Sequence, residues 1–226
     1  MRLLTFVICL CLASLSLAQE NSLYWKNRTP VQGYWQQDVA YAINASLNDE
    51  TELISGDLIL QYTNNSPDAL TQLYFHVYQN MFEPNSYKNQ FDGNSDAKAE
   101  EWQKTDVTNM RVNDRQVAFT KDNTMLIVDL PEPIMPGSVA KIECAFTTQF
   151  GSQGGRMKVY SSNGQKHFNV VHWYPRISVY DRKFGWTTDQ HLGHEFYGDF
   201  GTYEVEISLP EHYILDGTGK LLNRSE

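Results

Sequence analysis

Residues 37–62 read QDVAYAINASLNDETELISGDLILQY, and this stretch carries the clearest evidence for the fold. Apolar side chains recur at every second position on both sides of a central turn: Val39, Tyr41, Ile43, Ala45 and Leu47 before it, and Ile54, Leu58, Leu60 and Tyr62 after it. A period of two is typical of a strand with one buried face. Because Asn48, Asp49 and Glu50 between the two runs are turn formers, the stretch predicts a β-hairpin.

Similar short apolar runs follow along the chain, separated by turns rich in Asn, Asp, Gly and Pro. We expect strands over 70–78, 106–112, 116–119, 125–130, 139–150, 158–160, 168–171, 176–180, 202–209 and 213–215. The run at 70–78 is apolar on both faces and should be central, while prolines over 131–137 should impose a long bend. One or two helical turns are expected over 97–103. This pattern predicts an all-β fold, mostly antiparallel, built as a twisted sheet or sandwich with a few short helical turns.

The N-terminus has the features of a signal peptide. Met1 and Arg2 give a positive start, an apolar run over 3–17 is too short to span a bilayer, and Ala18 follows as a small residue at the cleavage position. We expect cleavage after Ala18 and export to the periplasm or the medium. Residues 19–33 should form a loosely docked arm, and residues 34–226 a single β domain. No later stretch is apolar enough to predict a membrane span.

Charge and cysteine content exclude several kinds of protein. The net charge is −9 at pH 7 and no basic cluster exists, so nucleic acid is not an expected partner. Cleavage of the signal peptide would leave Cys144 as the only cysteine, which rules out an intramolecular disulfide. Cys144 lies on the apolar side of an alternating run, so we expect a small buried core residue.

The pattern H-x-x-H-E at His191, His194 and Glu195 is the strongest candidate for a metal site. A zinc helix needs ligands three or four residues apart on one face, but Gly193 separates the histidines and a β pattern follows. The sequence also lacks the G-x-S-x-G motif of serine hydrolases. Several carboxylates could form a glycosidase pair only if two of them faced across a cleft. We therefore predict no catalytic residue and no metal ligand.

Aromatic residues are dense between residues 173 and 197. They could stack against a sugar or a peptide, or they could form an apolar patch that docks on another domain. The candidates for docking are Trp173, Tyr174, Trp186, Phe196 and Tyr197. The sequence leaves both interpretations open.

Three stretches together resemble the N-terminal domain of exported bacterial M1-family zinc aminopeptidases. They are YWQQDVAYAINASLNDETELISGDLILQYTNNSPDALTQLYFHVYQN over 34–80, HWYPRISVYD over 172–181, and EFYGDFGTYEVEISLPEHYILDGTG over 195–219. The resemblance covers nearly all of the chain after the signal peptide. It implies a saddle-like, mostly antiparallel β domain that packs beside a zinc-containing catalytic domain of the same polypeptide and helps to wall the peptide-binding cleft.

The resemblance also implies which residues act. The family's catalytic motifs, G-x-M-E-N and H-E-x-x-H, are absent, so the chain is expected to be inactive by itself, to hold no cofactor, and to be a fragment or a truncated product. In the family a Gln or Glu of this domain lies near the amine of the substrate. His172 occupies that region here and is the expected substrate-adjacent residue. The alternative is a free-standing exported β module that binds carbohydrate or peptide through exposed aromatics.

Overall fold

A computed structural model of the chain describes residues 32–93, 103–151 and 156–222. The chain divides into two compact units, Met1–Tyr34 and Trp35–Glu226, and every element named below belongs to the second unit. The expected signal peptide, nearly all of the expected N-terminal arm, and the helical turns expected over 97–103, apart from Gln103, lie outside the described residues. In the described part of the chain, no helix is long and apolar enough to cross a membrane.

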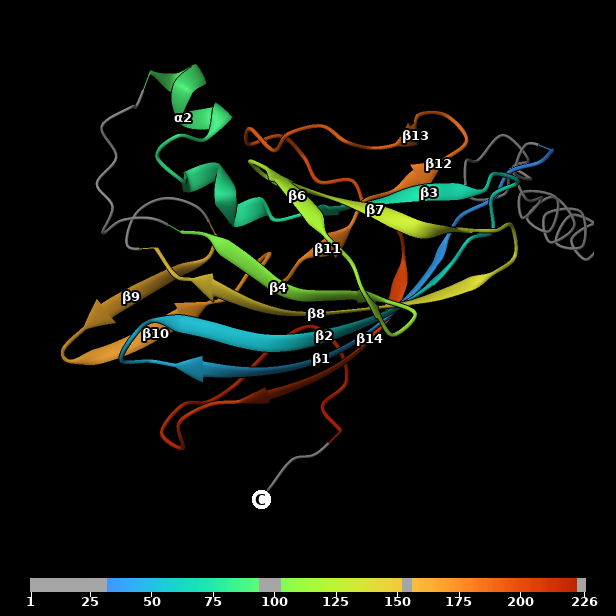
Figure 1. Cartoon of the computed structure of the whole chain (residues 1–226). Coiled ribbons are helices and arrows are strands. Elements are labelled where there is room, and N and C mark those ends of the chain that lie inside the picture. Colours follow the sequence, from blue (N-terminus) through green and yellow to red (C-terminus); the bar gives the residue numbers. More distant parts are fainter. Residues whose placement is uncertain (1–31, 94–102, 152–155, 223–226) are drawn as a thin grey trace, which may run out of the picture. The chain divides into compact units, whose positions relative to one another are not determined.

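The larger sheet has six strands in the order β14-β1-β2-β8-β4-β5 (Figure 1). These are β1 (Asp38–Asn48), β2 (Leu53–Thr63), β4 (Thr105–Val112), β5 (Arg115–Gln116), β8 (Val139–Gln149) and β14 (Gly201–Ser208). β1 and β2 pair in antiparallel fashion, with Tyr41 opposite Leu60 and Ile43 opposite Leu58. The hairpin predicted from residues 37–62 is therefore confirmed, and its apolar side chains share one face.

The second sheet has four strands in the order β11-β3-β7-β6. These are β3 (Leu70–His76), β6 (Phe119–Asp122), β7 (Met125–Ile134) and β11 (Arg176–Ile177). Two strand pairs stand apart: β9 (Lys158–Ser162) with β10 (Gln165–Asn169), and β12 (Tyr180–Asp181) with β13 (Gly185–Trp186). The described helices are short, namely the 3₁₀ helix η2 (Tyr78–Phe82) and α2 (Tyr87–Asp92).

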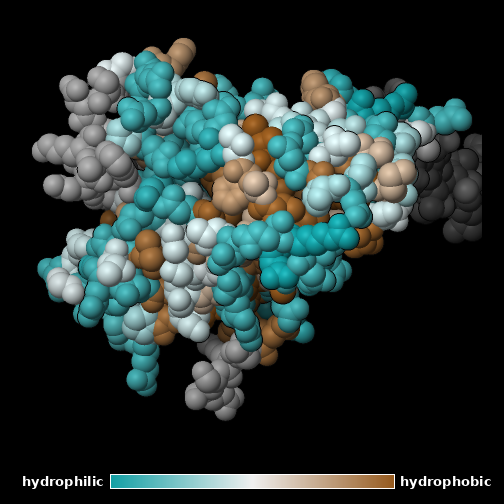
Figure 2. All heavy atoms as spheres, viewed as in Figure 1, coloured by the Kyte–Doolittle hydropathy of each residue, from teal (hydrophilic) through white to brown (hydrophobic). Residues whose placement is uncertain are grey.

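Both large sheets contribute to one hydrophobic core. Leu58 and Ile142 of the six-stranded sheet and Leu73 and Phe75 of the four-stranded sheet are all almost completely buried in the same cluster. Burial of one such side chain contributes about 1.5–3 kcal/mol, so the shared core is the main source of stability. Figure 2 shows hydrophobic residues in the middle of the viewed face, bordered by hydrophilic ones. The all-β prediction is confirmed.

Cys144 is also part of this core, as predicted. It is buried on β8, and it is a free thiol. Burial and the nearby Asp57 raise the pKa of Cys144 to about 12, so the thiol is protonated and unreactive at neutral pH.

Strand direction departs from the prediction at the edge of the larger sheet. β14 pairs with β1 in parallel, with Tyr41 beside Tyr203 and Ile43 beside Val205, whereas the other paired strands are antiparallel. A parallel partner cannot come from a tight hairpin, because the chain must cross over before it pairs. Apolar alternation marks which face of a strand is buried, but it carries no information on the direction of the partner.

Several predicted boundaries are wrong for local reasons. The strand expected over 176–180 is divided into β11 and β12, which belong to different sheets. The strand expected over 116–119 is divided between the two sheets, because the chain leaves β5 at Gln116 and enters β6 only at Phe119. β7 continues through the proline-rich segment to Ile134, and the pairing shifts between Leu70 and Gln72 to accommodate it. β3 lies inside its sheet as predicted but ends at His76. Residues 213–215 form no strand.

Candidate functional site

A half-open pocket lies where β3 leads into η2. Its volume is about 180 Å³. The lining side chains are aromatic, imidazole, amide and charged groups from segments far apart in the sequence: Tyr78, Gln79, Met81, Phe82, Arg156, His172, His191, Gly193, His194, Glu195 and Phe196. The alternation of buried and exposed residues ends here. Residues 76–81 are all buried, whereas a strand with one face toward solvent exposes every second residue.

Tyr78 stands at the centre of the pocket wall. Its ring is stacked on His76, with the ring centroids 4.9 Å apart. The edges of His172, His191 and Phe196 approach it at centroid distances of 4.9, 5.2 and 4.8 Å. The pocket therefore joins the HWYPR segment to the H-x-x-H-E-F segment, which the sequence suggested separately.

His172 occupies an unusual backbone conformation. Its φ angle is 55°, in the left-handed region that residues with a Cβ atom rarely adopt. Burial, followed by the positive charge of Arg176 and by His191 and Arg156, lowers the pKa of His172 to about 4. The imidazole is therefore neutral at pH 7 and carries one donor and one acceptor nitrogen. Neither nitrogen forms a hydrogen bond to another described residue.

Gln79 supports His172 from behind. Its Nε2 donates hydrogen bonds to the carbonyl oxygens of Val171, at 2.8 Å, and of His172, at 3.3 Å. Only 4% of Gln79 is exposed, and its Oε1 finds no partner among the described residues. The reversed amide would set an oxygen against two carbonyl oxygens, so these contacts fix its orientation. A buried unpaired acceptor costs about 1–3 kcal/mol, which a donor from a ligand would recover.

Sequence reasoning missed Gln79. It lies in the run HVYQNMF, where the strand pattern predicts either a surface position or a polar break. Its burial depends on carbonyl oxygens more than ninety residues away in the chain. The only available signal was a polar residue inside an aromatic run, which is not specific.

His76 lies behind Tyr78 and is almost fully buried. Ser178 Oγ is 3.2 Å from its Nε2, while its Nδ1 has no partner among the described residues. Burial, then His191 and Arg176, lowers the pKa of His76 to about 4. The Oγ of Ser178 also donates a hydrogen bond to the carbonyl oxygen of Thr187, which connects the segment after β11 to the loop before His191.

The charged groups of the pocket lie at its exposed rim. Arg156 is exposed, and its guanidinium carbon is 5.9 Å from the centroid of the Phe196 ring. Glu195 and His194 are also exposed, while His191 is buried and its backbone N–H donates to Thr124 Oγ1. Within residues 32–93, 103–151 and 156–222, no group of three or more His, Cys, Asp or Glu side chains is arranged to hold a metal ion.

The five aromatic residues suggested as a docking patch do not form one exposed surface. Trp173 and Tyr174 are half-buried against the core, with their ring centroids 5.3 Å apart. Trp186 packs among the core aromatics Tyr62, Tyr74 and Tyr180. Phe196 lines the pocket, and Tyr197 is 51% exposed. Docking of another domain on these residues remains a prediction. A sugar-stacking platform would need free ring faces on Trp173 and Trp186, but these rings already pack against other aromatic rings of the chain.

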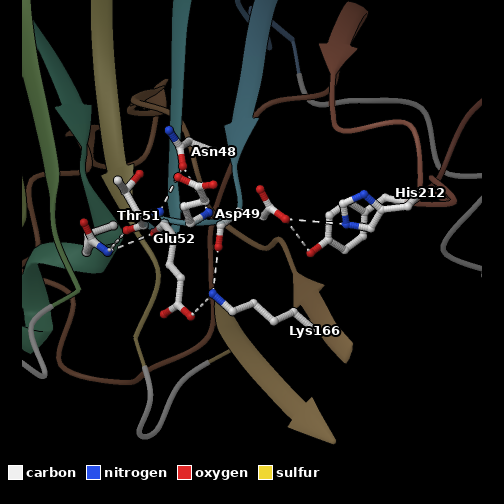
Figure 3. Close-up of polar contacts among 9 residues, drawn as sticks. Asn48, Asp49, Thr51, Glu52, Lys166 and His212 are labelled. Carbon is white, nitrogen blue, oxygen red and sulfur yellow. Dashed lines mark hydrogen bonds and ion pairs between the residues drawn. The ribbon is translucent and has the colours of Figure 1, made fainter. Parts of the chain in front are cut away.

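A second cavity, of about 620 Å³, lies beside the β1–β2 turn. Figure 3 shows the polar contacts at this turn. Lys166 Nζ donates to the carbonyl oxygen of Asp49 at 2.7 Å and lies 2.8 Å from Glu52 Oε1. The Oδ2 of Asp49 accepts a hydrogen bond from the hydroxyl of Tyr213 at 3.1 Å and is 3.5 Å from His212 Nε2. These contacts hold β10 and the segment after β14 to the turn. Because the polar groups are paired with one another, we interpret this cluster as structural.

Comparison with known proteins finds similarity in structure only. No protein-family model and no curated protein matches the sequence. A mutant M1 zinc metallopeptidase from Deinococcus radiodurans bound to a Tyr-Ser-Ala substrate matches with a TM-score of 0.47 and 13% identity, over 86% of this chain and 37% of that chain. A mutant two-domain M1 zinc metallopeptidase bound to L-arginine matches with a TM-score of 0.44 and 15% identity, over 81% of this chain and 35% of that chain. The chain is thus similar in structure to M1 zinc metallopeptidases over most of its own length and about a third of theirs.

Proposed function

We propose that this chain is the non-catalytic β domain of an M1-type zinc aminopeptidase, and that its pocket receives the free amino end of a peptide. The observation that carries the proposal is the composition of the pocket. All three stretches with the family resemblance meet there, and those over 34–80 and 172–181 bring together the unpaired Oε1 of Gln79 and a neutral His172.

The pocket offers what a primary ammonium group needs. An ammonium carries three donors and no acceptor, so it requires acceptor atoms around it. Gln79 Oε1 and a nitrogen of the neutral His172 would supply two acceptors. Glu195 would add negative charge at the rim. Arg156, on the exposed side of Phe196, would be free to donate to a peptide carbonyl oxygen.

Peptide hydrolysis would require groups that the described residues do not supply. In such an enzyme zinc polarises the scissile carbonyl group and activates water. No ligand set for zinc exists among the described residues, so the proposal assigns zinc and the general base to a separate catalytic domain of the same polypeptide. Export by a signal peptide at residues 1–18 is part of the proposal, as is a site of action in the periplasm or the medium.

Amine binding can be tested by calorimetric titration of the purified chain. The ligand is L-leucinamide, and N-acetyl-L-leucinamide is the matched control that lacks the ammonium group. We expect saturable binding of the free amine, with a dissociation constant on the order of 1 mM, and none of the acetylated compound. Gln79→Leu should abolish the difference between the two ligands. Equal binding of both compounds, or binding of neither, would overturn the proposal.

The non-catalytic assignment has a separate test. The purified chain is titrated with Zn²⁺ and assayed with leucine 4-nitroanilide in its presence. We expect no stoichiometric zinc binding and no release of nitroaniline. One bound equivalent of zinc together with hydrolysis would show that the chain holds a catalytic centre of its own.

A further inference from the structure

Three successive carbonyl oxygens in the loop between β10 and β11 accept hydrogen bonds from buried side chains. Gln79 Nε2 donates to those of Val171 and His172, and Thr148 Oγ1 donates to that of Trp173 at 2.7 Å. Among the described residues, these are the only hydrogen bonds to the main chain of this loop. Two side chains therefore hold the loop on both sides of His172, where the φ angle is positive.

Thr148 makes its bond from inside the larger sheet. It lies on β8, is completely buried, and pairs with Thr105 of β4, which is also buried. The two hydroxyl oxygens are 2.9 Å apart. A hydroxyl group has one proton, and Thr148 donates its proton to the carbonyl oxygen of Trp173, so Thr105 is the donor between the two threonines. Each hydroxyl in this buried chain thus has a defined role.

The same threonine pair also holds η2, the element that carries Gln79. Asn80 follows Gln79 and is completely buried. Its Oδ1 accepts a hydrogen bond from the backbone N–H of Thr105 at 2.7 Å, and its Nδ2 donates to the carbonyl oxygen of Thr105 at 3.2 Å. Buried networks of this kind are rigid when every member is paired, and loss of one member leaves its neighbours unpaired.

We propose that Thr148 is a positioning residue for the amine site. Its hydroxyl group holds the carbonyl oxygen after His172, while Gln79 holds that of His172 and the one before it, and together these bonds keep His172 in its left-handed conformation. His172 and Gln79 line the pocket, whereas Thr148 does not, so Thr148 acts only through the loop. This inference rests on the proposed function, but the conformation of His172 can be measured without a ligand.

The binding test compares Thr148→Val with Thr105→Val. Both variants lose one buried hydroxyl group of the same pair, but only Thr148→Val loses the bond to Trp173. We expect both to lose thermal stability. In nuclear magnetic resonance titrations with L-leucinamide, Thr148→Val should bind at least about tenfold more weakly than the parent chain, and Thr105→Val within about twofold of it. Thr148→Ser keeps the hydroxyl group and should bind like the parent.

The second measurement is the nuclear Overhauser effect between the amide and α protons of His172. A positive φ angle brings these two protons closer together than a negative one, so the signal should be intense in the parent and in Thr105→Val and weaker in Thr148→Val. Circular dichroism checks that each variant is folded. If Thr148→Val does not fold, Thr148→Cys takes its place, because a thiol is a much weaker donor than a hydroxyl group.

Two results would overturn the inference. One is that Thr148→Val binds L-leucinamide as well as Thr105→Val does, and the other is an unchanged signal between the two protons of His172. If the parent chain itself does not prefer L-leucinamide to N-acetyl-L-leucinamide, the proposed function fails instead. The measurement on His172 then decides alone whether Thr148 sets the conformation of the loop.

Discussion

At the scale of single residues, the pocket combines backbone strain with an unpaired polar group. His172 has a left-handed backbone, and the carbonyl oxygens of His172 and of the residue before it accept hydrogen bonds from Gln79. A strained backbone of this kind persists only where the surrounding contacts hold it in place, and such residues are concentrated at functional sites. The unpaired Oε1 of Gln79 lies beside this strained residue.

The strain at His172 can be measured by comparing His172→Gly with His172→Ala. Both variants lose the imidazole, but glycine adopts a positive φ angle without the steric cost that alanine has. We expect the glycine variant to be more stable than the alanine variant by about 1 kcal/mol in urea unfolding. Equal stability, or a more stable alanine variant, would mean that His172 is not held in the left-handed conformation.

His76 should make the fold less stable in acid. Its pKa is about 4 in the folded chain, against an ordinary value of 6.5, so the unfolded chain binds the proton more tightly. Stability is therefore fully present above about pH 6.5 and is lost as the pH falls through the folded pKa, by up to about 3 kcal/mol. His172 acts in the same direction. Asp199 acts in the opposite direction, because burial raises its pKa to about 6.

The contribution of His76 is isolated by His76→Gln. The free energy of unfolding is measured at about pH 7 and about pH 4.5 for both proteins. We expect the variant to lose clearly less stability between the two conditions than the parent chain. An identical loss in the parent and in His76→Gln would contradict the assignment.

At the scale of elements, β1, β2 and β8 meet at Gly56. A Cβ atom there would lie 2.7 Å from the carbonyl oxygen of Asn44 and 2.8 Å from Cζ of Phe146. The glycine thus admits the Phe146 ring of β8 against the β1–β2 pair.

We expect Gly56→Ala to destabilise the fold by about 1–3 kcal/mol, because either the Phe146 ring or the strand must move. Gly217→Ala is the control, since a Cβ atom at Gly217 meets nothing within 4 Å. Thermal unfolding of both variants provides the measurement. A Gly56→Ala variant as stable as Gly217→Ala would show that this part of the sheet is loosely packed.

The polar cluster at the β1–β2 turn should hold neighbouring segments more than it stabilises the whole fold. Lys166 is partly exposed, so its ion pair with Glu52 contributes at most about 1 kcal/mol. We expect Lys166→Met to leave global stability nearly unchanged but to speed amide hydrogen exchange in β10 (Figure 3). Exchange in β10 at the parent rate would show that Lys166 is not a tether.

The strands that the sequence predicts well are those with one buried face. The boundaries of β1, β2 and β8 follow from apolar alternation to within a residue or two, because the period of two directly reflects burial. Pairing direction and sheet membership depend on contacts between distant segments. The parallel partner of β1, and the division of residues 115–122 between two sheets, therefore could not be read from the local pattern.

At the scale of the whole molecule, the residues of the candidate site also divide into those that the sequence indicates and those that depend on contacts between distant segments. His172 was identified through the family resemblance, and the structure places it in the pocket. Gln79 was missed because its role depends on two carbonyl oxygens from a distant loop. The aromatics between 173 and 197 looked like one patch in the sequence, but the fold distributes them among the core, the pocket and the surface. Residue type shows that aromatics cluster, whereas only the fold shows which of them remain accessible.

The central claim is that a free amino group binds in the pocket at Tyr78, His172 and Phe196. It is tested most directly by intermolecular nuclear Overhauser effects between L-leucinamide and the assigned aromatic protons of the chain. The account predicts contacts from the ligand to the rings of Tyr78 and Phe196, which are lost in Gln79→Leu. Contacts only to other aromatic residues, such as those around Trp186, or contacts that persist unchanged with N-acetyl-L-leucinamide, would contradict it.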